Sequence, residues 1–322
     1  MKLLLLGFSN IARRRILPAA RAAGFDAIDV ASRSAASHNL TLLNVDAVYD
    51  DYESALDRSR ADLVYVSNVN SIHGPLAEAA LERGFHVVVD KPAFLSLSES
   101  SRLAGLALEK RLCLAEATVW QYHPRIHAAF EMFEEAGRAE HIVSSFSYPP
   151  MPEKDFRYNA SLGGGALLDL GPYAMTPARL FFRSVPQSMA AFCTSFKGAA
   201  ETAFSMAAIY PSGRSLVGSF GFTSGYINRM DIFGPGLAIG MDRVFSPPAN
   251  LETEMEVSGL AGRRSIKFPA ADTFAVFLQA VTKAIRDGDH ASFTRALISD
   301  AETLDRLRES ALAHNQGDRL TA

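Results

Sequence analysis

A short apolar strand in the first third of the chain ends in a charged pair and a proline, and chemistry is most expected there. A run of valines after His86 is typical of a buried parallel strand, and Asp90, Lys91 and Pro92 follow it at once. Ligands of parallel sheets bind beyond the carboxyl ends of the strands, so Asp90 and Lys91 stand where a ligand would lie. On spacing alone, a solvated strand end is an equally good interpretation.

A second group of reactive side chains follows three consecutive glycines. Gly163, Gly164 and Gly165 allow the backbone to approach a ligand or another helix very closely. Asp169 and Tyr173 are four positions apart, so they share one face if this segment is helical. A carboxylate that only caps or pairs, and a tyrosine buried in a helix contact, remain open as alternatives.

A lysine, a tyrosine and a carboxylate suit a reaction that moves a hydride and a proton. Hydride passes between a nicotinamide and carbon, while the protein orients the two and exchanges a proton with the carbinol or carbonyl oxygen. A tyrosine of reference pKa about 10 is a poor base near neutrality, but an adjacent ammonium favours the phenolate and lowers that pKa. Lys91 beside Tyr173 would have this effect.

The histidines show no spacing typical of a zinc site, so we expect no metal. The histidines considered are His73, His86, His123 and His127. His123 precedes Pro124 and is better explained as the residue that starts a helix than as a catalyst.

Composition limits the possible functions. The chain has 322 residues, 48% of them hydrophobic and 21% charged, enough for a large core and two domains. A net charge of −3 gives no basic field for nucleic acid or an anionic membrane, and no apolar stretch approaches the length of a membrane span. Cys113 and Cys193 lie in apolar surroundings and predict two buried free thiols in a reducing compartment, hence the cytoplasm. Met1 to Leu6 is too short for a signal peptide and predicts a first strand.

The start of the chain predicts a dinucleotide-binding turn. A strand from Lys2 to Leu6 leads into Gly7, and a helical pattern from Arg13 to Ala23 follows. In such a turn, backbone N–H groups and the helix N-terminus meet a pyrophosphate. The match to G-x-G-x-x-G is partial, because Ser9 replaces the second glycine and Ala12 the third, so a turn without a ligand explains it nearly as well.

The end of the second predicted strand, Phe25 to Ala31, indicates which cofactor is used. An acidic residue there holds the ribose of NAD, whereas an arginine pairs with the 2′-phosphate of NADP. Ser32 and Arg33 stand at the tip, followed by Ser34, while Asp29 has nearly the customary spacing but falls inside the strand. We therefore favour Ser32 and Arg33, and NADP(H) over NAD(H). A surface loop capped by Arg33 is the alternative.

Strands and helices alternate up to about residue 117, which predicts a doubly wound parallel sheet. Beyond it, residues 188–268 are typical of several strands of a largely antiparallel sheet, and helices over 273–286 and 300–314 end the chain. The expected domains are 1–117 for the cofactor and 118–322 for the substrate.

Taken together, the motifs resemble the Gfo/Idh/MocA oxidoreductases, named for glucose-fructose oxidoreductase and inositol dehydrogenase. The resemblance covers nearly the whole chain and rests on the Gly7 turn with Ile11-Ala12, the Asn70 to His73 loop, Asp90-Lys91-Pro92, and Gly163-Gly164-Gly165 with Asp169 and Tyr173. The usual Glu-Lys-Pro appears here with the shorter acid. Many members have histidine at the position of Tyr173, and the tyrosine form is similar to glucose-fructose oxidoreductase, pyranose and dihydrodiol dehydrogenases, and nucleotide-sugar 3-ketoreductases.

The resemblance implies a Rossmann domain that binds NAD(P), and a C-terminal α/β domain with a large open sheet for substrate and oligomer contacts. It implies a catalytic set of Lys91, Tyr173 and Asp169, and a cis Lys91–Pro92 bond. The cofactor-binding set that we expect is Gly7, Ser9, Asn10, Ile11, Ser32, Arg33, Asn68, Asn70, His73, Asp90, Lys91 and Gln121.

We therefore expect an NADP(H)-dependent oxidoreductase of a sugar, nucleotide sugar or polyol, assembled as a homodimer or homotetramer. A sensor that binds dinucleotide on the same fold without turnover is the alternative from another class, because fold alone does not establish function.

Overall fold

The computed structural model describes residues 1–33, 44–260 and 262–318, which form two compact units. The first unit contains Met1–Val119 and Thr273–Ala301, and the second contains Trp120–Asp272 and the chain from Glu302 onward. Ser34, at the end of the expected cofactor motif, lies outside the described residues. A domain boundary at residue 117 stays a prediction. The compact units differ from it because residues 273–301 pack in the first unit.

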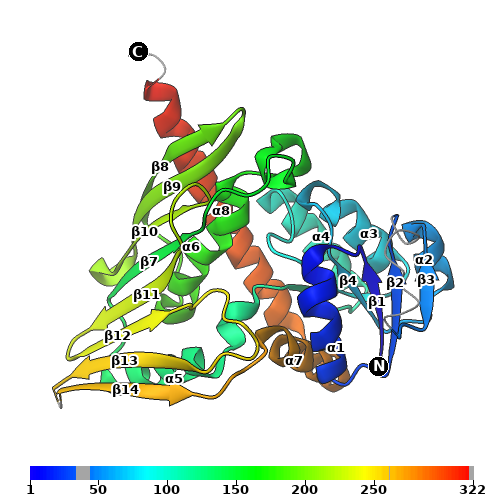
Figure 1. Ribbon diagram of the computed structural model, residues 1–322, viewed down its shortest axis with the longest axis horizontal. Coiled ribbons are helices and arrows are strands. Elements are labelled where there is room, and N and C mark those ends of the chain that lie inside the picture. The colour runs from blue at the N-terminus through cyan, green and yellow to red at the C-terminus, as the bar shows by residue number, and fades with distance from the viewer. Residues whose placement is uncertain (34–43, 261, 319–322) are drawn as a thin grey trace. The chain divides into compact units, whose positions relative to one another are not determined.

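A six-stranded parallel sheet forms the centre of the first unit, in the order β3-β2-β1-β4-β5-β6 (Figure 1). The strands are β1 (Lys2–Leu6), β2 (Ala27–Ala31), β3 (Ala47–Tyr49), β4 (Leu63–Val66), β5 (His86–Val89) and β6 (Leu114–Glu116). Apolar runs such as Leu3 to Leu6 and Val87 to Val89 are fully buried, as expected for strands covered on both faces. The strand order is that of a Rossmann fold, which confirms the predicted parallel sheet.

Helices cover this sheet. They are α1 (Leu17–Ala22), α2 (Tyr52–Arg58), α3 (His73–Glu82), α4 (Leu97–Glu109), α7 (Thr273–Asp287) and the first part of α8 (Ala291–Asp318). A π-helical turn, Ala12–Ile16, precedes α1, so the helical segment begins earlier than the pattern predicted. Helix α7 packs against this segment, with the Arg15 guanidinium 5.2 Å from the Phe274 ring.

The second unit is built on an eight-stranded sheet in the order β14-β13-β12-β11-β7-β10-β9-β8. The strands are β7 (His141–Ser147), β8 (Ser188–Lys197), β9 (Ala200–Ile209), β10 (Ser215–Gly221), β11 (Ile227–Gly234), β12 (Leu237–Asp242), β13 (Thr253–Gly259) and β14 (Gly262–Phe268). Strands β7 and β10 pair in parallel, and the other neighbours are antiparallel. The predicted mostly antiparallel open sheet is thus confirmed.

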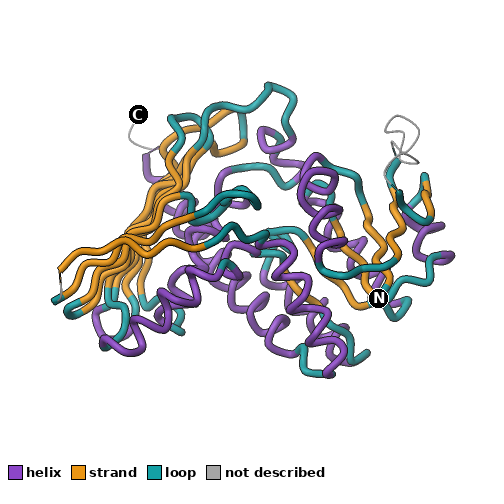
Figure 2. Tube along the Cα trace, turned by 60° about the horizontal axis from the view of Figure 1, so that its bottom comes forward, coloured by secondary structure: helices purple, strands orange, loops and turns teal. Residues whose placement is uncertain are grey.

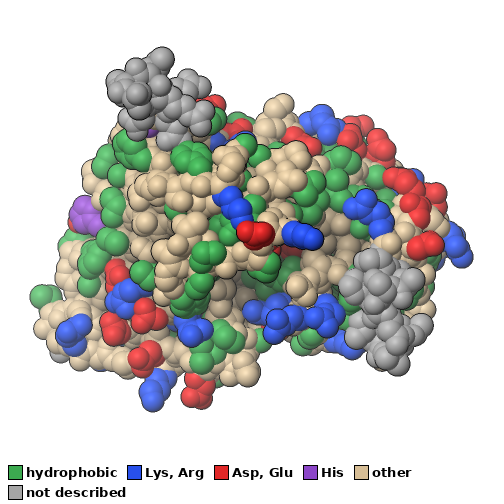
Figure 3. Space-filling view, turned by 45° about the horizontal axis from the view of Figure 1, so that its top comes forward, with side chains coloured by type: hydrophobic (Ala, Val, Ile, Leu, Met, Phe, Trp, Pro, Cys, Tyr) green, Lys and Arg blue, Asp and Glu red, His purple; other side chains and the backbone are tan. Residues whose placement is uncertain are grey.

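Helices lie along one face of this larger sheet, which Figure 2 shows nearly edge on. Helix α6 (Ala166–Phe182) packs on β7, β9 and β10, and α5 (Pro124–Ala136) packs on β12. The outward-pointing side chains of β7, β9, β10 and β11 include Val143, Ile209, Val217 and Phe233, all of them exposed. Basic and acidic side chains are interspersed over the surface seen in Figure 3.

Two local expectations differ from the structure. Helix α8 begins at Ala291, nine residues before the predicted start, because its first turns bury Leu297 in the core of the first unit. Cys113 is buried as expected, but Cys193 is half-buried, because β8 is the edge strand of the larger sheet. The expectation of two buried thiols was therefore wrong for Cys193.

Candidate functional site

The turn after β1 can only be made by glycine. Gly7 has a φ of +97°, and a Cβ there would lie 2.1 Å from the Ser67 carbonyl oxygen and 2.6 Å from Asn68 Nδ2. The Ser9 hydroxyl accepts a hydrogen bond of 3.0 Å from the Ala12 backbone N–H and thereby caps the helix. Asn10 and Ile11 are exposed in this first turn. A close-fitting turn that leads into a helix N-terminus suits a dinucleotide phosphate.

Near the end of β2, the structure distinguishes the acidic candidate for the ribose end of the cofactor, Asp29, from the basic candidate, Arg33. Asp29 is fully buried and is engaged by Lys2 Nζ at 2.9 Å and by the Ser59 hydroxyl at 2.7 Å. Ser32 is buried at the strand end, and the exposed Arg33 has its guanidinium 5.8 Å from the Tyr52 ring. Asp29 therefore has a structural role within the first unit, which supports the preference for Arg33. The contact of Arg33 with a 2′-phosphate stays a prediction.

The loop after β4 is held by its own side chains. Asn68 Nδ2 donates to the Leu6 carbonyl at 2.8 Å, and Asn68 Oδ1 accepts from the Tyr52 hydroxyl at 2.9 Å. The buried His73 ring lies between two carbonyl oxygens, with Nε2 3.0 Å from that of Asn68 and Nδ1 3.0 Å from that of Pro92. His73 thus joins the loops after β4 and β5, while the Asn68 side chain ties the β4 loop to the end of β1 and to Tyr52. Burial lowers the pKa of His73.

Asp90 sits at the carboxyl end of β5. The Tyr65 hydroxyl donates to its Oδ1 at 2.7 Å, and the Ser67 hydroxyl donates to its Oδ2 at 2.7 Å. Burial raises the pKa of the Asp90 carboxyl, while these two hydrogen bonds oppose the rise. The half-buried Lys91 follows, and its bond to Pro92 is cis, as the resemblance suggested.

In the second unit, Asp169 is held at the first turn of α6. The Tyr148 hydroxyl donates to its Oδ2 at 2.6 Å, and Arg157 Nε lies 3.0 Å from the same oxygen. Burial, followed by the negative charge of Asp169, raises the pKa of Tyr148, and the same carboxylate raises the pKa of Arg157. Tyr148 therefore stays protonated and donates to Asp169.

Gly165 brings the start of α6 close to a neighbouring strand. Its φ is +114°, and a Cβ there would lie 2.3 Å from Glu201 Oε1. Glu201 belongs to β9, so the glycine is needed for a helix-to-sheet approach within the second unit.

Tyr173 is half-buried on α6, one turn after Asp169. Its ring centroid lies 5.2 Å from that of Phe146 and 5.3 Å from that of Phe245. The ring is thus fixed by aromatic packing, and the predicted shared helix face of Asp169 and Tyr173 is present.

His123 and Gln121 have structural partners. His123 caps α5, and its Nδ1 accepts a hydrogen bond of 3.2 Å from the Arg125 backbone N–H. Burial lowers its pKa to about 4. Gln121 Oε1 accepts from Arg179 Nη2 at 3.2 Å. The prediction that His123 starts a helix is confirmed.

The structure thus gathers most predicted cofactor residues at one edge of the first unit, beyond β1, β2, β4 and β5. Gln121, Asp169 and Tyr173 belong to the second unit. Four polar partners were not predicted from the sequence: Tyr65, Ser67, Tyr148 and Arg157. Ser67 follows β4 directly, a signal that could have been used. Arg157 lies in a loop whose pattern gave no indication of its partner.

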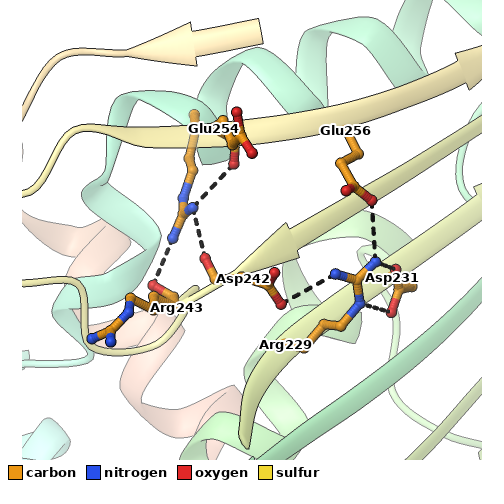
Figure 4. A network of polar contacts seen from close by, with 7 residues as sticks. Arg229, Asp231, Asp242, Arg243, Glu254 and Glu256 are labelled. Carbon is orange, nitrogen blue, oxygen red and sulfur yellow. Dashed lines mark hydrogen bonds and ion pairs between the residues drawn. The ribbon is translucent and has the colours of Figure 1, made fainter. Parts of the chain in front are cut away.

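A separate ion network crosses the outer face of the larger sheet (Figure 4). Arg229 pairs with Asp231 at 2.7 Å, Asp242 at 3.1 Å and Glu256 at 3.4 Å, which come from three neighbouring strands. Gly240 makes room for it, because a Cβ there would lie 2.6 Å from Arg229 Nη2. A hollow of about 170 Å³ opens here, and no predicted site residue lines it.

Two family models match the chain. Residues 1–118 match the oxidoreductase family with an NAD-binding Rossmann fold, and residues 133–236 match the GFO/IDH/MocA C-terminal domain. The chain belongs to the Gfo/Idh/MocA oxidoreductases. Among the described residues of this Gfo/Idh/MocA protein, no group of three His, Cys, Asp or Glu side chains is placed to hold a metal, and no helix could cross a membrane.

Several Gfo/Idh/MocA relatives are similar over nearly the whole chain. A dTDP-3,4-didehydro-2,6-dideoxy-α-D-glucose 3-reductase from Actinomadura kijaniata is 29% identical over 95% of this chain and 94% of its own. An NADP⁺-dependent D-xylose 1-dehydrogenase from Haloferax volcanii is 26% identical over 95% and 96%. A solved 3-ketoreductase from A. kijaniata, a tyrosine-to-phenylalanine mutant with TDP-benzene and NADP, has a TM-score of 0.90 and 27% identity over 97% and 98%.

Proposed function

We propose that this protein transfers hydride between NADP(H) and a carbonyl or carbinol carbon of a sugar that carries a nucleoside diphosphate. At the coarser level it is an NADP-dependent oxidoreductase of a sugar substrate. The similarity to a dTDP-sugar 3-reductase over 95% of the chain is the observation that supports the nucleotide-linked substrate. The tyrosine at position 173 agrees with that branch of the family.

In this proposal, bound NADP(H) supplies or accepts the hydride, and the residues of the chain handle the proton. Tyr173 exchanges the proton with the substrate oxygen, and the Lys91 ammonium favours the phenolate form that makes this exchange possible near neutrality. Asp169 orients the substrate or the tyrosine. Because Tyr148 and Arg157 already hold its carboxylate, Asp169 is suited to orienting rather than to proton transfer.

In this proposal, NADP(H) binds to residues of the first unit. The Gly7 turn and the exposed start of the helix receive the phosphates, and Arg33 pairs with the 2′-phosphate that distinguishes NADP. Arg33 is exposed at the end of β2, whereas Asp29 is buried and paired. Asp29 is therefore not placed to bind the ribose of NAD.

A turnover assay with NADPH and a panel of nucleotide-linked keto sugars and free sugars tests the proposal. Tyr173→Phe keeps the ring packing and removes the hydroxyl, so turnover should fall by about 10²–10⁴-fold while NADPH affinity barely changes. Tyr210→Phe is the matched control, because the buried Tyr210 hydroxyl has no hydrogen-bond partner among the described residues. Its turnover should equal that of the wild type.

Near-normal turnover of Tyr173→Phe on the best substrate would remove the tyrosine from its role. Binding of NADPH without turnover of any sugar by the wild type would favour the sensor. Activity on free sugars alone would exclude the nucleotide requirement.

We also propose that the protein is a homo-oligomer in the cytoplasm, with subunits joined through the open face of the larger sheet. The exposed outward side chains of β7, β9, β10 and β11 support this assembly. In register, Val143 lies opposite Val217, and Val217 lies opposite Ala207, so the apolar positions adjoin.

A further inference from the structure

Three adjacent strands of the first sheet end in side chains that are hydrogen-bonded to one another. Strands β1, β4 and β5 are neighbours, and Ser9, Ser67 and Asp90 follow them in that order. The Ser67 hydroxyl lies 2.7 Å from Asp90 Oδ2 and 2.9 Å from the Ser9 hydroxyl. Ser67, after the middle strand, therefore joins the two outer ones.

The direction of each hydrogen bond follows from the number of protons. A carboxylate only accepts, so Ser67 donates its single proton to Asp90. The Ser9–Ser67 contact must then use the proton of Ser9, whose oxygen accepts from the Ala12 backbone N–H at 3.0 Å. Ser9 thus donates into the protein, and a phosphate at the turn would meet backbone N–H groups rather than this hydroxyl.

This row of hydrogen bonds runs from the dinucleotide turn to the residue before Lys91. The proposed function needs these two places to be held in a fixed position relative to each other. Ser9 and Ala12 shape the helix N-terminus beside Gly7, and Asp90 immediately precedes Lys91. The Tyr65 hydroxyl holds the other oxygen of Asp90 at 2.7 Å. The carboxylate is thereby fixed from β4 alone, although it is one methylene shorter than the glutamate usual in the family.

We infer that Ser67 is a positioning residue that couples the dinucleotide turn at Ser9 to Asp90 and thereby to Lys91. This inference rests on the proposed function. In this inference, Ser67, Ser9 and Asp90 together hold the dinucleotide turn and Lys91 in place. The effects of substituting Ser9 and Asp90 on NADPH binding and on stability should therefore depend on each other only while the Ser67 hydroxyl is present. Side chains that do not share a partner have additive effects.

A double-mutant cycle of Ser9→Ala and Asp90→Asn tests the coupling, first with Ser67 and then in the Ser67→Ala background. One readout is the dissociation constant for NADPH, measured by its fluorescence, and the other is the urea midpoint of the protein without cofactor. With Ser67 present, the double variant should depart from additivity by at least about threefold in the dissociation constant. With Ser67→Ala, additivity should hold within about twofold.

Ser59→Ala is the matched control, because Ser59 also donates a 2.7 Å hydrogen bond to a carboxylate of the first unit, that of Asp29. Loss of that bond should lower the urea midpoint and leave NADPH binding unchanged. Ser67→Ala should weaken NADPH binding by about tenfold, because the turn at Ser9 and the Asp90 carboxylate lose the partner that holds both.

Additive effects with Ser67 present, equal coupling without it, or weakened NADPH binding in Ser59→Ala would each overturn the inference. If the wild type does not bind NADPH, the proposed function fails. The departure from additivity in the urea midpoints would then still show whether Ser67 couples Ser9 to Asp90.

Discussion

Two tyrosines of the second unit, Tyr148 and Tyr173, differ in the chemistry open to them. Tyr148 donates to the carboxylate at 2.6 Å, and burial and that negative charge raise its pKa, so it acts as a fixed donor. A phenolate at Tyr173 would oppose ionisation of Tyr148 further. Tyr148 is therefore kept as a hydrogen-bond donor, and we propose Tyr173 for the proton exchange with substrate.

The cofactor preference depends on Arg33. Arg33→Ala should lose one charge-assisted contact with the 2′-phosphate and weaken NADPH binding by about 1.5–3 kcal/mol, while NADH binding changes little. Titration of both cofactors by fluorescence measures this. Arg58→Ala is a suitable control, since Arg58 is also exposed and lies over a tyrosine ring, that of Tyr49, at 5.7 Å. Equal NADPH affinity of wild type and Arg33→Ala would exclude the assigned contact.

At the scale of elements, helix α5 depends on a histidine that must stay neutral. His123 Nδ1 accepts the hydrogen bond from the Arg125 backbone N–H, and a protonated Nδ1 could not accept it. Burial and the nearby positive charge of Arg125 lower the pKa of His123 to about 4. The N-cap therefore makes the fold sensitive to acid.

The sign of this effect follows from linkage. Between pH 6.5 and 4 the unfolded chain binds a proton at His123 that the folded chain does not bind. The free energy of unfolding therefore decreases as the pH is lowered. The loss should reach about 3 kcal/mol by pH 4, and burial of His73 and His86 acts in the same direction. Urea unfolding across this range measures it.

His123→Asn keeps a capping acceptor that does not titrate, so its free energy of unfolding should fall less between pH 6.5 and 4. His127→Asn, at an exposed position of the same helix, should follow the wild type. Parallel curves for wild type and His123→Asn would show that the cap is not responsible.

At the scale of the whole molecule, the open face of the larger sheet is the surface that an oligomer would bury. Val143 and Val217 lie opposite each other on neighbouring strands at the centre of the sheet, and both are exposed. Contiguous exposed apolar side chains on a sheet face mark interaction surfaces.

We expect a dimer or tetramer by light scattering at micromolar concentration. Val217→Lys should shift the mass toward the monomer, because burying an unpaired ammonium in an apolar interface is costly. Leu108→Lys, at an exposed apolar position on α4, should leave the mass unchanged. A monomeric wild type would contradict the assembly.

The sequence by itself determined the elements and the places where chemistry is possible. Apolar runs fixed the strands, and Asp90 and Lys91 could be placed at a sheet edge because parallel strands end there together. The helical spacing of Asp169 and Tyr173 was likewise sufficient to put them on one face. These properties depend on residues within a few turns of one another, which is the range that a sequence pattern records.

Only the tertiary structure decided which of these side chains are already occupied. The buried ion pair of Asp29, the bond from Tyr148 to Asp169 and the bond from Ser67 to Asp90 each join residues 21 or more positions apart. The same holds for the packing of residues 273–301 on the first unit. Such contacts depend on the order of strands in a sheet and on which loops meet at its edge, and periodicity along one segment carries no information about either.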